Sequence, residues 1–168
     1  MMSDPLAPLS ASAPDCALII VADPPLGRAV AQALAGTDHT ITFHAADDTA
    51  TTEAMARALA SQPLKDAEGN IVILLTGAAA LIGPEQAPEQ SIKARAQEAR
   101  AKDALKQSNF NALTRSLALE LAPAVRVNAV NIKGTRVDAR VIADTVLFVL
   151  ATRALTGQMI TLGDEAPT

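Results

Sequence analysis

Residues whose side chains most often carry catalytic chemistry are few in this sequence. It has two histidines, His39 and His44, one cysteine, Cys16, and neither tyrosine nor tryptophan. Without tyrosine, no mechanism can use a phenol as proton donor. The two histidines lie in one predicted strand at an odd separation, so we expect them on opposite faces and predict no metal site. Cys16 begins an apolar run, which predicts a core thiol rather than a nucleophile.

Motifs for the common hydrolytic and phosphate-transfer chemistries are absent. The chain contains no H-E-x-x-H, no G-x-S-x-G and no Walker loop, so zinc hydrolysis, nucleophile-elbow chemistry and P-loop chemistry have no support. Its 14 lysines and arginines against 18 aspartates and glutamates give a net charge of −4. Because nucleic-acid binding requires clustered cations, we do not expect a nucleic-acid partner.

The densest charge lies in a long predicted helix over residues 91–121. Arg95, Lys102 and Lys106 are spaced to share one face of this helix. Two interpretations of that face remain open: it is a solvated helix surface, or it meets an anion or an acidic partner. Glu98 stands four residues before Lys102, a spacing that favours an ion pair along the helix.

The elements that position these residues alternate between apolar strands and amphipathic helices. Short β-branched runs predict strands buried on both faces, as parallel strands are. The predicted strands are residues 16–22, 39–44, 70–75, 125–132 and 158–164, and a helical segment separates each from the next. This order predicts an α/β fold with a doubly wound parallel sheet.

The first residues of the chain differ in composition from the rest. Residues 1–14 are dominated by proline, serine and alanine, which predicts a flexible arm before a single domain over residues 15–168. The start carries no positively charged segment, and the apolar run 17–22 is too short for a signal peptide or a membrane span. We therefore expect a cytoplasmic protein with no membrane association, and the single thiol fits a reduced compartment.

The second half of the chain carries a family resemblance. The helix ending NALTRSLALELAP at residues 111–123, and the strand VRVNAV that follows at 125–130, closely resemble the corresponding elements of short-chain dehydrogenases/reductases. Residues 143–150 and 155–162, the latter containing Thr-Gly-Gln, resemble that family's last helix and last strand. The resemblance implies a Rossmann-like α/β domain.

The first half resembles the family more loosely. Residues 17–35 are similar to its first strand and helix, and residues 69–76 to the strand that carries its catalytic serine. Most of the family's middle segment, including its Asn-Asn-Ala-Gly strand, has no counterpart. The resemblance therefore implies an abbreviated, degenerate member with a shortened sheet.

The family's cofactor loop, Thr-Gly-x-x-x-Gly-x-Gly, is almost entirely replaced. Its four defining positions read Ile20, Val21, Pro25 and Gly27 here, so only the last glycine remains. Asp47 follows Gly27 by 20 residues, a spacing at which a carboxylate can meet a ribose, although an acidic pair there also fits the start of the next helix. Gly27 and Asp47 are the only remnants of a cofactor site, and we expect no cofactor.

The family's catalytic pair, Tyr-x-x-x-Lys, is also replaced. Alignment on Asn-Ala-Leu-Thr at residues 111–114 puts Asp103 at the tyrosine position and Gln107 at the lysine position. Thr76 falls at or next to the serine position, but its separation from Asp103 is longer than in the family. An aspartate is a poor proton donor at neutral pH and glutamine brings no charge, so no confident catalytic residue is predicted.

The leading hypothesis is therefore a non-catalytic family member, a pseudoenzyme that acts by assembly or binding. Its long helix and its final helix and strand would form the interface of a homo-oligomer or bind a protein partner. Two alternatives remain open. One is an NAD(P)-dependent oxidoreductase of the family with an atypical site, and the other is a small-ligand sensor that keeps an adenine-sized crevice.

Overall fold

The computed structural model describes six stretches of the chain, residues 16–21, 24–46, 48–62, 69–76, 89–133 and 137–163. The predicted arm at residues 1–14 and the candidate ribose contact Asp47 lie outside the described residues. Five strands and four helices fall inside them.

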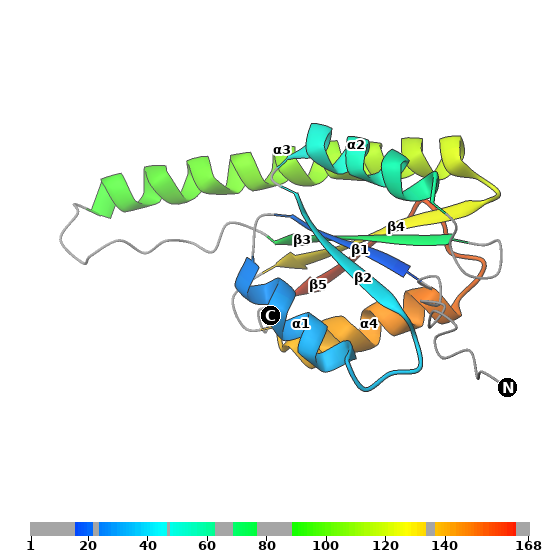
Figure 1. Cartoon of the computed structure of the whole chain (residues 1–168). Helices are drawn as coiled ribbons and strands as arrows, with labels where there is room; N and C mark the ends of the chain where they lie inside the picture. The colour runs from blue at the N-terminus through cyan, green and yellow to red at the C-terminus, as the bar shows by residue number, and fades with distance from the viewer. Residues whose placement is uncertain are drawn as a thin grey trace, which may run out of the picture.

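A five-stranded parallel sheet forms the centre of the molecule (Figure 1). Its order is β2-β1-β3-β4-β5. The strands are β1 (Cys16–Val21), β2 (Ile41–Ala46), β3 (Gly69–Thr76), β4 (Val125–Lys133) and β5 (Met159–Gly163). The apolar runs of β3 and β4 are explained by their central positions, where helices cover both faces of a parallel strand. The predicted α/β fold with a shortened parallel sheet is confirmed.

Within the described stretches, four helices cover the two faces of this sheet. They are α1 (Pro24–Leu34), α2 (Thr49–Ala60), α3 (Glu89–Leu121) and α4 (Ala139–Ala151). Figure 1 shows α2 and α3 on one face and α1 and α4 on the other. This arrangement is the doubly wound one, in which successive crossovers place helices on opposite faces of the sheet.

Each face of the sheet has its own apolar core. Phe110 and Leu117 of α3 are buried against the α2/α3 face. Ile142, Val146 and Val149 of α4 are buried against the other face. Within each helix these side chains are three, four or seven residues apart, the spacing of one buried helical face.

The second strand begins two residues later than predicted. Thr37 closes a turn on the end of α1, because both its backbone N–H and its Oγ1 hydroxyl donate to the carbonyl oxygen of Leu34, at 3.1 and 2.9 Å. The residues after Thr37 then lead the chain to the edge of the sheet, where Ile41 is the first residue to pair, with Cys16. His39 therefore lies before the strand, and the prediction that both histidines occupy one strand was wrong.

The direction of strand addition reverses between β1 and β3. From β1 the sheet grows to β2 on one side and, later in the sequence, through β3 and β4 to β5 on the other. In doubly wound sheets, ligands bind outside the carboxyl ends of the strands at such a reversal. Val21 and Thr76 end the two strands concerned.

Helix α3 is longer than the sheet that it covers. Its 33 residues correspond to a length of about 50 Å at 1.5 Å per residue. Residues 93–98 and 100–102 are all exposed, whereas Phe110, Thr114 and Leu117 are buried. Figure 1 shows the first half of the helix extending beyond the carboxyl end of β3. Only the second half of α3 therefore belongs to the core.

Two polar side chains of β4 hold the end of α4 and the chain that follows it. The guanidinium of Arg126 donates to the carbonyl oxygens of Thr152 and Leu150 at 2.8 and 3.1 Å, which satisfies carbonyls that the helix end leaves without helical partners. Asn128, which is 1% exposed, donates to the Leu155 carbonyl at 2.9 Å and accepts from the Gln158 backbone N–H at 3.1 Å.

The Thr-Gly-Gln segment between α4 and β5 is built around one glycine. Gly157 has a φ of 69°, in the left-handed region that glycine adopts without a steric penalty. Its N–H donates to the Val127 carbonyl at 2.7 Å, and the Ala129 N–H donates to the Gln158 carbonyl at 2.8 Å. An added Cβ would lie 3.3 Å from the Cβ of Ala118 on α3. The conformation and the close packing both require glycine here.

Candidate functional site

The two positions aligned with the family's catalytic pair lie on the sheet-facing side of α3. Asp103 and Gln107 are one helical turn apart and both are partly buried. Phe110 and Thr114 continue the same side and are buried, whereas Leu105, on the opposite side, is 64% exposed. The helix therefore presents Asp103 and Gln107 toward the carboxyl end of the sheet.

The end of β3 is joined to this part of α3 by a lysine. The Lys106 ammonium donates to the backbone carbonyl oxygen of Thr76 at 3.1 Å. Lys106 is the residue immediately before Gln107, the position aligned with the family's lysine. A cation thus lies beside the strand end, one residue from the aligned position. Sequence reasoning missed this contact because a backbone acceptor leaves no signal in residue type.

The Thr76 side chain belongs to the other face of the sheet. Thr76 pairs with Ile132 in the register of β3 and β4, and Ile132 lies in the core on the α1/α4 face. Leu75 belongs to the core on the α2/α3 face. Because side chains alternate along a strand, the structure brings the carbonyl of Thr76 to α3 and directs its side chain to the opposite layer from Asp103 and Gln107.

The remnants of the cofactor loop lie at the start of α1. Pro24 and Pro25 open the helix, where a missing backbone N–H has no helical partner to lose. Gly27 is buried in the first turns of α1. Residues 22 and 23 lie outside the described residues, as does Asp47.

The acidic residue next to Asp47 has a structural role. Asp48 is the N-cap of α2, and its Oδ1 accepts a hydrogen bond from the Thr51 backbone N–H at 2.7 Å. This hydrogen bond holds the pKa of Asp48 below its ordinary value. The sequence interpretation that the acidic pair begins the next helix is confirmed for Asp48.

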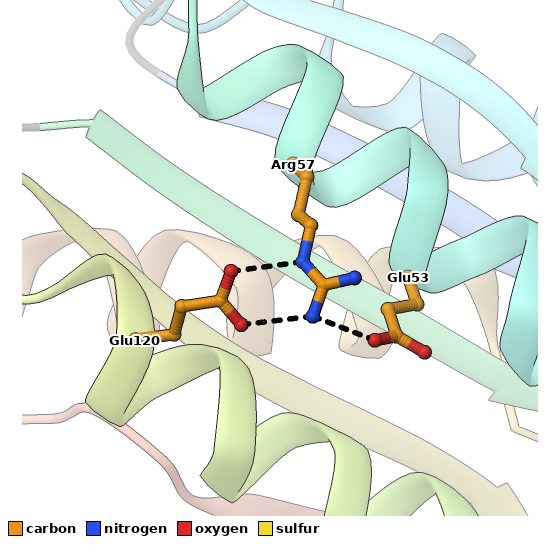
Figure 2. Close-up of polar contacts among 3 residues, drawn as sticks. All are labelled: Glu53, Arg57 and Glu120. Carbon is orange, nitrogen blue, oxygen red and sulfur yellow. Dashed lines mark hydrogen bonds and ion pairs between the residues drawn. The ribbon is translucent and has the colours of Figure 1, made fainter.

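An ion pair joins α2 to α3 along their outer surface (Figure 2). Arg57 donates through Nε and one terminal nitrogen to both carboxylate oxygens of Glu120, at 2.8 and 3.0 Å, and contacts Glu53 at 2.7 Å. The hydrogen bonds with Glu120 raise the pKa of Arg57, and Arg57 lowers the pKa of Glu120. Because these side chains are about half exposed, the pair orients the two helices more than it stabilises them.

A pocket of about 290 Å³ lies between the start of α2 and the middle of α3. Seven residues line it: Asp48 and Thr49 at the start of α2, and Lys102, Leu105, Lys106, Asn109 and Phe110 on α3. The pocket therefore contains both lysines from the charged helix face that the sequence singled out.

In the part of the chain that the structure describes, no group of three or more metal-binding side chains comes together. No helix within those same stretches has the length and apolar character to cross a bilayer. Cys16 is fully buried in β1, as predicted for a core thiol.

Comparison with known proteins finds a family match for the second half of the chain. Residues 84–162 match the family described as short chain dehydrogenase-like protein. No curated protein sequence matches the chain. Among solved structures, FolM alternative dihydrofolate reductase 1 from Brucella canis, complexed with NADP, is similar with a TM-score of 0.53 and 15% identity over 89% of this chain and 93% of that chain.

Two further solved structures have lower similarity. FolM alternative dihydrofolate reductase 1 from Brucella suis, in complex with NADP, has a TM-score of 0.49 and 15% identity over 88% of this chain and 93% of that chain. A Serratia marcescens short-chain dehydrogenase/reductase mutant has a TM-score of 0.48 and 16% identity over 89% and 96%.

The parallel sheet, the helices on both of its faces and the site at its carboxyl end define a Rossmann-like α/β domain. The family match over the second half of the chain extends this assignment. Residues 84–162 therefore carry the family match, and the chain as a whole has a Rossmann-like fold with a five-stranded sheet.

Proposed function

We propose that this chain is a non-catalytic member of its family, which acts by assembly or binding rather than by hydride transfer. The observation that carries the proposal is the chemistry of the two helix positions that face the carboxyl end of the sheet. Asp103 and Gln107 stand there in place of the tyrosine and lysine of the family pattern. An ionised carboxylate accepts hydrogen bonds but has no proton to donate, and an amide carries no charge.

Thr76 supports the same proposal. A serine or threonine that orients a substrate carbonyl must point its hydroxyl into the same space as the proton donor. Thr76 pairs with Ile132, whose side chain belongs to the α1/α4 core. A three-residue constellation with Asp103 and Gln107 therefore has no support in this geometry.

The family-like residues in the second half have structural roles. Arg126 holds the end of α4, Asn128 holds the chain before β5, and Gly157 makes the turn between them. The resemblance of this half to the family is therefore explained by folding requirements alone. Retention of the fold beside replacement of the catalytic pair is the pattern expected of a pseudoenzyme.

Self-assembly is the activity that we propose for this scaffold. Val141 and Phe148 lie two helical turns apart on α4 and are 48% and 58% exposed, and Leu119 on α3 is 83% exposed. Because α3 and α4 cover opposite faces of the sheet, a second copy of the chain would cover Val141 and Phe148 on α4. Light scattering should give a mass above that of one chain, and Phe148→Glu should lower it. A single-chain mass across a wide concentration range would refute the assembly.

Cofactor binding and turnover test the non-catalytic part of the proposal. Calorimetric titration with NADH and NADPH should show no binding at micromolar concentration, and neither cofactor should be oxidised in the presence of ketones or pterins. The double variant Asp103→Tyr with Gln107→Lys should remain inactive, because the cofactor loop retains only Gly27 of its glycines. Turnover by the natural sequence would refute the proposal. Turnover by the double variant alone would show that the cofactor site is intact.

An NADP-dependent oxidoreductase is the second candidate, and one observation favours it. The Brucella canis protein with a similar fold was solved in complex with NADP. If this chain binds the same cofactor, Lys106 is a cation available to it, because its ammonium lies beside the end of β3. Fluorescence titration with NADPH separates the candidates, because a micromolar dissociation constant supports the oxidoreductase and its absence supports the non-catalytic protein.

A further inference from the structure

The pocket between α2 and α3 has a composition suited to an anionic ligand. Lys102 and Lys106 stand one helical turn apart on one side of α3, and both line it. Residues at this spacing have Cβ atoms about 5–6 Å apart, so two ammonium groups can contact one anion with several oxygens. A lysine ammonium carries three N–H donors. The contacts of Lys102 with Glu98 and of Lys106 with the Thr76 carbonyl use one donor each.

The polar residues at the start of α2 add a hydrogen-bond acceptor to the pocket. Asp48 lines it while its Oδ1 accepts from the Thr51 N–H at 2.7 Å. A carboxylate has acceptor positions beyond one such bond, so Asp48 can also accept a hydrogen bond from a ligand hydroxyl. Thr49 and Asn109 contribute a hydroxyl and an amide to the same lining. The pocket thus offers donors to an anion and an acceptor to a neutral hydroxyl group.

The apolar part of the lining limits the ligand further. Leu105 is 64% exposed although it lies in the middle of α3, and Phe110 is buried beneath the pocket. The volume of about 290 Å³ is near the lower limit for small-molecule pockets. A ligand with a carbon ring, hydroxyl groups and one strongly charged end fits these features, because its ring can cover Leu105 while its charge contacts the lysines.

We infer that the pocket between α2 and α3 binds a small sugar phosphate. Its phosphate lies between Lys102 and Lys106, and its hydroxyl groups donate to Asp48. The inference goes beyond the proposed function, because the pocket uses neither the cofactor loop nor the exposed surface of α4. The pocket can bind this ligand whether or not the protein is an enzyme. A negative result for the pocket therefore does not decide the proposed function, and the reverse also holds.

Titration of the full chain with ribose 5-phosphate tests the inference. Perturbation of backbone NMR signals should map to the start of α2 and to residues 102–110, with a dissociation constant of about 1 mM or lower. Ribose and inorganic phosphate, tested in parallel, should each bind at least about tenfold more weakly, because each satisfies only part of the lining. Lys102→Gln and Lys106→Gln should each weaken ribose 5-phosphate binding by about tenfold.

Arg100→Gln is the matched control, because it removes the same charge from an exposed position on α3. It should leave binding unchanged, and Lys102→Gln and Arg100→Gln should melt at the temperature of the natural sequence. Equal losses in all three variants would indicate nonspecific charge attraction and overturn the inference. It would also fail if ribose 5-phosphate produced no mapped perturbation at about 10 mM, tenfold above the expected constant, or if inorganic phosphate bound equally well.

Discussion

Replacing Asn128 by alanine should destabilise the protein more than any other change of a polar side chain on β4. Asn128 is 1% exposed, and its amide makes two hydrogen bonds to the chain before β5. It donates to the Leu155 carbonyl at 2.9 Å and accepts from the Gln158 N–H at 3.1 Å. Alanine removes both bonds and leaves a backbone carbonyl and a backbone N–H without these partners.

The magnitude follows from the burial of the groups left behind. A buried polar group that loses its partner costs about 1–3 kcal/mol. Leu155 is partly buried and Gln158 is exposed, so water reaches the Gln158 N–H more easily and reduces its share. Asn128→Ala should lower the free energy of unfolding by about 2–4 kcal/mol, a large part of the usual total of about 5–15 kcal/mol. Urea unfolding measures this difference directly.

Asn128→Asp gives a pH-dependent version of the same test. The carboxylate can still accept from the Gln158 N–H, but it faces the Leu155 carbonyl without a donor. Burial and this unfavourable contact raise the pKa of the new carboxyl in the folded state above its unfolded value. The folded protein therefore binds the proton more tightly, so stability is higher at low pH and is lost as pH rises through the raised pKa.

Gln97→Ala is the control, because it removes an amide from an exposed position on α3. It should change the free energy of unfolding by less than about 0.5 kcal/mol. If Asn128→Ala behaved like this control, the hydrogen bonds of Asn128 would contribute nothing to the fold, and the structural explanation of the retained family-like residues would fail.

Three further substitutions test other parts of the structure. Gly157→Ala should cost about 1–2 kcal/mol in urea unfolding, because alanine is strained at a φ of 69° and its Cβ would lie 3.3 Å from that of Ala118. Phe110→Ala should cost about 3–5 kcal/mol, because this side chain is 2% exposed in the core. Arg57→Gln should make thermal stability fall less steeply on acidification. Arg57 holds the pKa of Glu120 below its ordinary 4.5. The stabilisation from this ion pair is therefore complete above pH 4.5 and is lost as pH falls through the lowered pKa. An unchanged pH profile in Arg57→Gln would contradict the ion pair.

The bounds of a strand were predicted well from the sequence where helices cover both faces of that strand. Strands β3 and β4 are covered on both faces, so their apolar runs mark them within one residue at either end. β2 lies at the sheet edge, and its mixed polar pattern does not define where pairing starts. The turn at Thr37 decides that point through a hydrogen bond to the Leu34 carbonyl, which residue types alone do not reveal.

The candidate site was only partly predictable for a related reason. Helical spacing correctly put Asp103 and Gln107 on one side of α3, because i and i+4 residues share a face. The contact of Lys106 with the Thr76 carbonyl depends on how far α3 lies along β3, a tertiary distance that local periodicity does not contain. The face to which Thr76 points depends on strand register, and a shift of one residue reverses it.

Helix α3 extends well beyond the part of it that packs on the sheet. Its second half is fixed to the sheet through Phe110, Thr114 and Leu117, while residues 93–98 and 100–102 are exposed. Residues 93–102 extend for about 15 Å at 1.5 Å per residue, so a tilt of about 10° in the packed half would displace residue 93 by about 3 Å relative to residue 102. Lys102 and Lys106 lie where the exposed part of α3 meets the packed part. A small change of packing at the sheet would therefore displace the exposed residues of α3 further than the packed ones.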